Sequence, residues 1–169
     1  MSLRALLGIE LPIIQAPMAG AQGSELAIAV SNAGALGSLP CAMLGEAAMR
    51  DELHALRAGT ARPFNVNFFC HETPIGDAAR DASWRAMLAP YYRETGLDVG
   101  VLAAAPSRAP FSAAAAELLA EFRPAVVSFH FGLPSADLLA RVRAWGAKVL
   151  CSATTIDEAC WLDAQSVDA

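Results

Sequence analysis

The sequence predicts an α/β fold, a partial (β/α)8 TIM barrel of about five parallel strands with alternating helices. Strand-like and helix-like segments alternate along all 169 residues, which is typical of parallel βαβ units. The strand-like segments are nearly unbroken apolar runs, as in sheets covered on both faces. Five strands suffice for an open doubly wound sheet, whereas a complete barrel typically takes about 250 residues. For a barrel, we therefore expect residues 1–169 to form the N-terminal part, with the C-terminal strands absent.

Five segments are predicted as strands because each is a short apolar run bounded by Gly, Pro or polar residues. The fourth has the clearest pattern and the second the weakest. In chain order they are Leu11–Gln15, Ala35–Leu39, Phe64–Phe69, Val126–Phe131 and Lys148–Cys151. Residues 166–169 would then open a further strand.

Six segments are predicted as helices, mostly from apolar residues recurring with the helical period. They span about 24–33, 46–58, 77–95, 112–122, 135–145 and 155–162. The first is expected to bury the face formed by Leu26, Ala29, Val30 and Ala33. Gly34 follows where a helix end needs a left-handed residue. The stretch 96–110 has little period and two prolines, so we expect most of it to be a connection.

Composition and charge exclude several classes of protein. The net charge is −5 and no run of Lys or Arg occurs, so the basic surface of a nucleic-acid binder is missing. No apolar stretch reaches the roughly eighteen residues of a membrane span, and the N-terminus lacks the apolar region of a signal peptide. We therefore expect a cytoplasmic protein with no nucleic-acid or membrane partner. Gly-rich nucleotide-binding motifs and metal-ligand spacings are also missing from the sequence, so no metal site is predicted.

Strand parity places polar side chains on the inner face of the predicted sheet. Successive side chains of a strand point to opposite faces, so Asn65 and Asn67 share one face of the third predicted strand. In the fourth, Ser128 and His130 share a face by the same rule. The opposite, large apolar set suits the helix-facing side: Val127, Phe129 and Phe131. The inner face is therefore predicted to be polar toward its carboxyl end.

Two of these side chains are candidates for chemistry. His130 lies near the carboxyl end of its strand, where barrel enzymes have their active sites, and an imidazole titrates near neutral pH. Asn67 both donates and accepts hydrogen bonds, which suits the polar edge of a flat ring. Each also has a plainer explanation, because a single His at a strand end is often a core or rim residue and an Asn often makes a turn.

Several longer motifs together resemble one known family. The sequence is similar to the nitronate monooxygenases, formerly called 2-nitropropane dioxygenases, in order and at sensible spacing over the whole chain. The segments that carry the resemblance are Pro12–Gly20, Ala29–Gly37, Arg62–His71, Val126–Pro134 and Ala153–Ala159.

The resemblance implies an FMN-dependent barrel enzyme that oxidises alkyl nitronates or nitroalkanes with O2 to a carbonyl compound and nitrite. By this resemblance, Ala16, Pro17 and Met18 would lie against the flavin ring. Asn67 would hydrogen-bond the flavin or its phosphate side. His130 would be the active-site base or the residue that binds the anion. The partners implied are a small nitro compound and O2.

Two departures from the family pattern shape the remaining expectations. Some members place a catalytic His at the end of the fifth strand, where this sequence has Cys151, which shifts the weight to His130. Members also continue past the position of Ala169, and barrel phosphates usually bind after strands 7 and 8. We therefore expect a fragment that binds FMN weakly and is inactive alone. Open sheet edges would favour self-association as a homo-oligomer or pairing with another chain.

Two other functions remain open from the sequence. One is a flavin-dependent enoyl reductase of the same superfamily, which would use NAD(P)H and an acyl thioester. The other is a non-catalytic βα module that assembles with a partner chain.

Overall fold

The computed structural model describes residues 2–98 and 108–169, which fall into two compact units. The larger unit comprises residues 1–71 and 108–169, and the smaller comprises residues 72–107. Most of the connection predicted over residues 96–110 lies outside the described residues.

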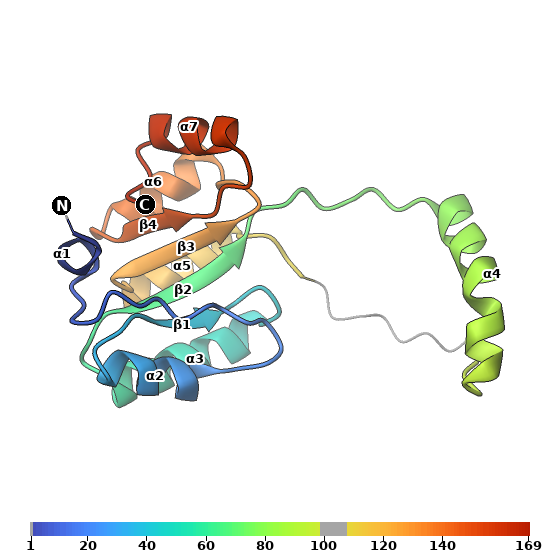
Figure 1. The fold of residues 1–169 in the computed structure, drawn as a ribbon, viewed down its shortest axis with the longest axis horizontal. Coiled ribbons are helices and arrows are strands. Elements are labelled where there is room, and N and C mark those ends of the chain that lie inside the picture. Colours follow the sequence, from blue (N-terminus) through green and yellow to red (C-terminus); the bar gives the residue numbers. More distant parts are fainter. Residues whose placement is uncertain (1, 99–107) are drawn as a thin grey trace. The chain divides into compact units, whose positions relative to one another are not determined.

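The larger unit is built on a parallel sheet of four strands (Figure 1). The strands are β1 (Gly37–Pro40), β2 (Phe64–Phe69), β3 (Val126–His130) and β4 (Lys148–Cys151). They pair in chain order, β1-β2-β3-β4, and each pair is parallel. This confirms the predicted alternation of parallel strands and helices.

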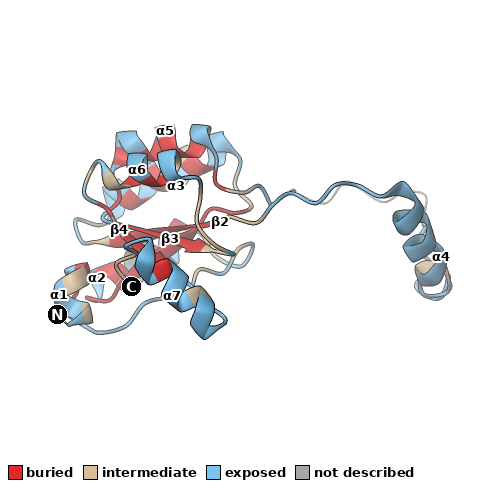
Figure 2. Ribbon diagram, turned by 90° about the horizontal axis from the view of Figure 1, so that it is seen from above, coloured by how far each residue is buried: buried red, intermediate tan, exposed pale blue. Residues whose placement is uncertain are grey.

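The helices of the larger unit follow the predicted segments, with one addition. They are α1 (Leu3–Leu7), α2 (Ser24–Asn32), α3 (Glu46–Gly59), α5 (Ala113–Phe122), α6 (Ala136–Arg143) and α7 (Ile156–Ala164). Side-chain hydroxyls cap α5 and α7, since Ser112 accepts from the amide of Ala115 and Thr155 from that of Glu158; α1 has a similar cap, described below. Helices α3, α5 and α6 lie on one side of the sheet (Figure 2).

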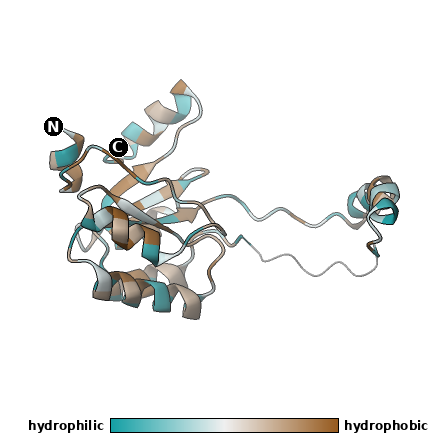
Figure 3. Cartoon of the chain, turned by 60° about the horizontal axis from the view of Figure 1, so that its bottom comes forward, coloured by the Kyte–Doolittle hydropathy of each residue, from teal (hydrophilic) through white to brown (hydrophobic). Residues whose placement is uncertain are grey.

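The main core lies between the sheet and these helices. The strand residues that point outward into it are Leu39, Val66, Phe68, Val127, Phe129 and Val149. The helix residues that meet them include Met49, Leu53, Leu56, Leu118, Leu119, Phe122, Leu139 and Val142. The outer helices alternate hydrophilic and hydrophobic patches, as amphipathic helices do (Figure 3). The apolar residues that recur with the helical period in α3, α5 and α6 are therefore the ones that these helices bury.

A smaller core covers part of the opposite, inner face of the sheet, from the residue before β1 to the row of Ser128 and Leu150. Its strand-side members are Leu36, Val126 and Leu150. Helix α1, which the sequence analysis missed, packs Leu7 against them and begins after Ser2, whose hydroxyl accepts from the amide of Ala5.

The first predicted strand, Leu11–Gln15, is reduced to a single parallel bridge between Ile14 and Leu36. The ladder stops there because the side chain of Gln15 takes over the next position. Its amide oxygen accepts from the backbone amide of Ser38 at 3.1 Å, and its Nε2 donates to the carbonyl oxygen of Ser38 at 3.2 Å. The main chain is thereby free to turn away after residue 15.

The buried face predicted for α2 is wrong. The buried residues of α2 are Ser24, Ala27 and Ser31, whereas Leu26 is 40% exposed. Small side chains let α2 approach β1 so closely that a Cβ at Gly37 would overlap the carbonyl oxygen of Ala27. Ser31 reinforces this contact, because its hydroxyl accepts from the amide of Gly37 at 3.1 Å and lies 3.0 Å from the carbonyl oxygen of Pro63, to which it donates.

Residues 168–169 continue the sheet beyond β4. The amide of Asp168 donates to the carbonyl oxygen of Val149 at 2.9 Å, and the amide of Cys151 donates to that of Ala169 at 3.0 Å. These bonds fit the further strand that the sequence predicts to open at residues 166–169.

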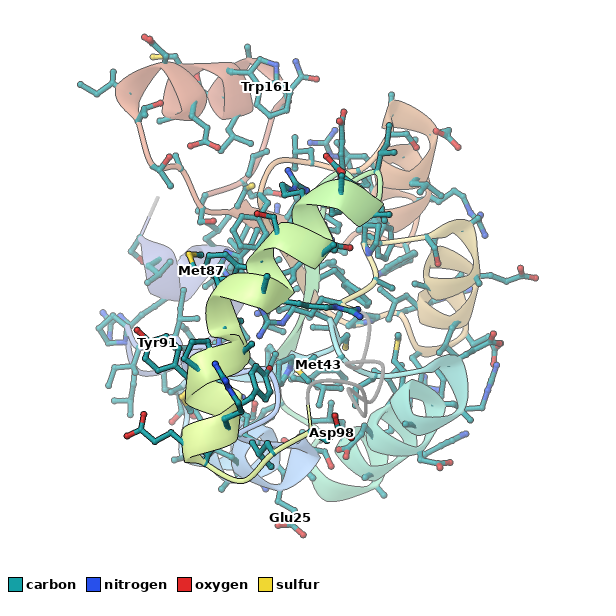
Figure 4. The ribbon with its side chains drawn as sticks, turned by 90° about the vertical axis from the view of Figure 1, so that its right-hand side faces the viewer. Glu25, Met43, Met87, Tyr91, Asp98 and Trp161 are labelled. Atoms are coloured by element: carbon teal, nitrogen blue, oxygen red, sulfur yellow. The ribbon has the colours of Figure 1, made fainter. Side chains whose placement is uncertain are left out.

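The smaller unit contains α4 (Ala78–Glu94), which matches the predicted helix 77–95. Asp77 caps it by accepting from two backbone amides of the first turn. Met87 and Tyr91 project from the same side of α4, as residues four apart do (Figure 4). Among the described residues, no helix combines the length and apolar character that crossing a membrane requires.

Candidate functional site

The candidate site lies on the inner face of the sheet, toward the carboxyl ends of the strands. Parallel register sets the side chains in rows, with Asn67 beside Ser128 and Phe69 beside His130. His130 therefore lies one row above Asn67 and Ser128 on the same face, as strand parity predicted. One departure is Phe131, which was predicted to face the helices. It lies outside the strand with φ of 65° and is 63% exposed.

The two rows below His130 contain a buried network of neutral polar groups. Asn65 donates from Nδ2 to the hydroxyls of Ser38 at 3.1 Å and Ser128 at 2.8 Å. Asn67 donates from Nδ2 to the same Ser128 hydroxyl at 2.9 Å and to the Ser128 carbonyl at 3.3 Å. Each of the four residues is at most 7% exposed. The network therefore forms a rigid polar layer across three strands.

One acceptor in this layer has no partner within the described part of the chain, namely Oδ1 of Asn65. A buried carbonyl oxygen without a hydrogen bond costs about 1–3 kcal/mol. The layer is therefore ready to accept a further donor from the inner side of the sheet. The two Nδ2 hydrogens of Asn67 are already bound by Ser128, which leaves its Oδ1 for a ligand.

His130 ends β3 and is half-buried. Its Nδ1 lies 2.7 Å from the hydroxyl of Ser152, the residue that follows β4. Burial lowers the pKa of His130 below its ordinary value of 6.5. Its imidazole is therefore neutral near neutral pH, the state in which it accepts a proton.

The Cys151 thiol, at the position where some family members have a histidine, is unsuited to that task. Burial raises the pKa of Cys151 above its ordinary value of 9.0. A thiol with a raised pKa stays protonated near neutral pH and is a poor base or nucleophile.

Aromatic rings surround His130 at the rim of the sheet. The ring centroids of Phe69 and Phe131 lie 6.2 and 6.3 Å from that of His130, and the two phenyl rings meet edge to face at 4.9 Å. His71 joins them, 6.2 Å from Phe69. A positive φ is costly for a bulky residue such as Phe131, and such strain clusters at functional sites. We call these four residues the aromatic rim.

The loop Ala16–Met18 follows the Gln15 side-chain bridge. Pro17 is half-buried and Ala16 is exposed, while Met18 is 47% exposed. A second side chain, Gln22, returns to the same strand and donates to the carbonyl oxygen of Ser38 at 2.8 Å. The loop is therefore held at both ends against β1 and presents an apolar surface between them.

The structure unites some of the predicted site residues and leaves others apart. Asn67 and His130 share one face, with Asn67 buried beneath the rim. Ala16, Pro17 and Met18 lie on a separate loop, and among the described residues no hydrogen bond or ring contact joins this loop to His130. The sequence analysis missed Phe69 and Ser152. Parity with Asn67 would have identified Phe69, and the end of the fifth predicted strand would have identified Ser152.

These residues fit a flavin by their chemistry. An apolar, sterically small loop suits the face of a flat ring, and buried amides with an open acceptor suit its polar edge. In the described part of the chain, no group of three or more His, Cys, Asp or Glu residues is arranged to hold a metal ion.

Comparison with known proteins identifies the family. The sequence matches the family model described as nitronate monooxygenase over residues 1–169. It is 43% identical over 175 residues to a nitronate monooxygenase of Paraburkholderia phytofirmans, covering 99% of this chain and 46% of that protein. It is 42% identical over 174 residues to one of Pseudomonas aeruginosa, covering 97% of this chain and 47% of that protein. The chain spans about half the length of these curated relatives.

A solved structure gives the same assignment. The nitroalkane oxidase from Streptomyces ansochromogenes superposes with a TM-score of 0.81 at 34% identity, covering 98% of this chain and 46% of that one. The predicted partial (β/α)8 barrel is thereby confirmed. With its parallel sheet, its inward histidine and a family match over its whole length, this chain belongs to the nitronate monooxygenase family.

Proposed function

We propose that the chain supplies the N-terminal part of an FMN-dependent active site that oxidises alkyl nitronates or nitroalkanes with O2 to a carbonyl compound and nitrite. The observation that carries the proposal is the position of His130, on the inner face above the buried layer of Asn65, Asn67 and Ser128. Active sites of (β/α)8 barrels lie at this end of the strands. We also propose, as expected from the sequence, that the protein is located in the cytoplasm.

His130 has two tasks in this proposal. Neutral, it takes the proton from the carbon beside the nitro group of a nitroalkane, so that the C–H electron pair enters the C=N bond of the nitronate. Protonated, it holds the nitronate oxygens by charge-assisted hydrogen bonds. Burial among Phe69 and Phe131 lowers the pKa of His130 and thereby favours the first task.

The chain's own residues bind and position the cofactor and the substrate. Ala16, Pro17 and Met18 would lie against the flavin ring, and Asn67 would offer its Oδ1 to the polar edge. Phe69 and Phe131 exclude water from the side of the imidazole. Bound FMN supplies the electron transfer to O2, while the protein supplies position and electrostatic field.

The relatives are about twice as long as the stretch that matches, and phosphate sites of such barrels lie after strands 7 and 8. We therefore propose that residues 1–169 alone bind FMN weakly. Titrating the purified chain with FMN and following flavin fluorescence tests this, and submicromolar binding would contradict it.

The activity is tested in a chimera that joins residues 1–169 to the remainder of the Paraburkholderia relative. We expect visible flavin absorbance, O2 uptake and nitrite release from a nitronate without NAD(P)H. His130→Gln should lower turnover of a nitroalkane about 10²–10⁴-fold, the usual contribution of a general base. His54→Gln is the matched control, because His54 lies exposed on α3 against Phe122.

The assay also separates the other predicted functions. Turnover only with NAD(P)H and an acyl thioester would identify an enoyl reductase. A folded chimera with neither flavin nor turnover, beside an active parent relative, would favour the non-catalytic module. Equal activity of the His130→Gln and His54→Gln chimeras would show that His130 has no catalytic role.

A further inference from the structure

Helix α2 begins without a side-chain cap of its own. The residue before it is Gly23, which has no side chain, and the acceptor for the first amide comes from α3 instead. Oε2 of Glu52 accepts from the amide of Ser24 at 2.6 Å, and hydrogen bonds to a charged acceptor are short in this way. Glu52 therefore caps α2 from a different helix.

Gly23 leaves the space that this cap needs. A Cβ on Gly23 would lie 3.1 Å from Oε1 and 3.2 Å from Oε2 of Glu52, closer than side chains ordinarily approach. The backbone of Gly23 is extended, with φ of −122°, so its conformation does not require a glycine. What the position requires is the absence of a side chain beside the carboxylate.

Helix α2 is tied to α3 at its other end as well. Nδ2 of Asn32 donates to the carbonyl oxygen of Gly59 at 3.0 Å, and the hydroxyl of Thr60 donates to Oδ1 of Asn32 at 2.7 Å. Glu52 itself is half-buried, and Ser24 is 5% exposed. The bond at the start of α2 is therefore the more shielded of the two ties.

The start of α2 is also the end of the loop formed by residues 16–23. Before that point, Gln22 donates to the carbonyl oxygen of Ser38 at 2.8 Å. The Sδ of Met43 lies 3.4 Å from the position that a Cβ on Gly20 would take. Glu52 adds an anchor one residue past the loop, so the loop has little freedom where it enters the helix.

We propose that Glu52 is a positioning residue that fixes the start of α2 and thereby holds residues 16–23 in the form that a flavin ring meets. This inference rests on the proposed function, in which Ala16, Pro17 and Met18 meet the ring. A loop that is ordered before binding loses little freedom on binding, which favours affinity. The carboxylate also fills the place at the N-terminus of α2 where an anion would bind. Glu52 therefore acts on the ring of the flavin and not on its phosphate.

Hydrogen exchange of the chain, followed by NMR, tests the cap without a cofactor. Glu52→Ala should speed exchange of the Ser24 amide about tenfold or more, the loss of a hydrogen bond to a charged group. The amide of Ala21, which donates to the carbonyl oxygen of Met18 at 3.0 Å within the loop, should exchange faster too. Glu52→Gln keeps an oxygen acceptor and should recover part of both effects. Unchanged exchange at either amide in Glu52→Ala would overturn the inference.

Flavin affinity connects the cap to the cofactor. In the chimera, Glu52→Ala should weaken the binding of FMN and of riboflavin by the same factor, about tenfold, because the two flavins share the ring that the loop meets. With FMN at saturation, kcat should stay close to that of the unsubstituted chimera. A gain in affinity for FMN relative to riboflavin would overturn the inference, since it would make the start of α2 a phosphate site that Glu52 blocks.

The matched control is Ser112→Ala, which removes the cap of α5, a helix that does not follow the loop. It should lower Tm by a comparable amount and leave flavin affinity unchanged. Equal losses of flavin affinity in Ser112→Ala and Glu52→Ala would reduce the effect to general destabilisation and refute the positioning role. If the unsubstituted chimera binds neither flavin, the proposed function fails, whereas exchange at Ser24 and Ala21 still decides whether Glu52 sets the loop.

Discussion

Replacing Ser128 by alanine tests whether the buried polar layer holds the sheet together. The hydroxyl of Ser128 accepts from Nδ2 of Asn65 at 2.8 Å and from Nδ2 of Asn67 at 2.9 Å. Ser128→Ala removes both bonds while keeping the backbone acceptor for Asn67. Each donor retains one weaker partner, the Ser38 hydroxyl at 3.1 Å and the Ser128 carbonyl at 3.3 Å respectively. The loss in free energy of unfolding is therefore at least that of two ordinary hydrogen bonds, but smaller than if both donors were left without any partner.

The magnitude follows from those bonds. A buried hydrogen bond contributes about 1 kcal/mol net, and an unsatisfied buried group costs about 1–3 kcal/mol. We expect Ser128→Ala to lower the free energy of unfolding by about 2 kcal/mol. For a chain of this length, that corresponds to a fall in Tm of roughly 4–8 °C.

Urea unfolding followed by far-UV circular dichroism measures this loss. A double-mutant cycle with Asn67→Ala should give a coupling of about 1 kcal/mol, since the two residues are in direct contact. Ser83→Ala is the surface control. A loss below about 0.5 kcal/mol, the range of neutral surface substitutions, would refute the account of this layer as a stabilising network.

Three further predictions follow from single contacts. Gly37→Ala should cost about 3 kcal/mol or more in thermal unfolding, because the new Cβ overlaps the carbonyl oxygen of Ala27; an unchanged Tm would contradict the close approach of α2. Gln15→Ala should speed hydrogen exchange of the Ser38 amide about fivefold, the loss of one hydrogen bond worth about 1 kcal/mol, and an unchanged exchange rate would contradict the side-chain bridge. Because burial holds the pKa of His130 below 6.5, unfolding takes up a proton in the pH range between its folded and unfolded values. Stability should therefore fall as the pH drops through that range, and less so in His130→Gln when both are compared by urea unfolding.

Strand parity was the strongest source of correct prediction. In β2 and β3 every second residue is a large apolar side chain, so the opposite set had to face the interior of a barrel. That argument placed Asn65, Asn67, Ser128 and His130 on one face, and the register of the strands agrees. Parity fails at Phe131, because it applies only while the backbone is extended and φ at this residue is positive.

The errors share a physical cause. The face of α2 was predicted from side-chain size, yet the helix packs through Ala27 and Ser31 because Gly37 removes the obstacle to close approach. The strand at residues 11–15 ended early because Gln15 bonds to Ser38 as a backbone would. Both outcomes depend on contacts between segments distant in sequence. The periodicity of apolar residues within one segment carries no information about such contacts. Helix α1 has five residues, too few to show a period at all.

The inner face changes character along the strands in a way that suits a base at its rim. Leu36 and Val126 contribute apolar side chains toward the amino end, and Leu150 on β4 lies level with Ser128. The next layer is polar but neutral, made of amides and hydroxyls bound to one another. A carboxylate in that layer would raise the pKa of the imidazole above it by favouring the charged form. With neutral neighbours below, burial dominates and lowers the pKa of His130, and the imidazole stays available to accept a proton.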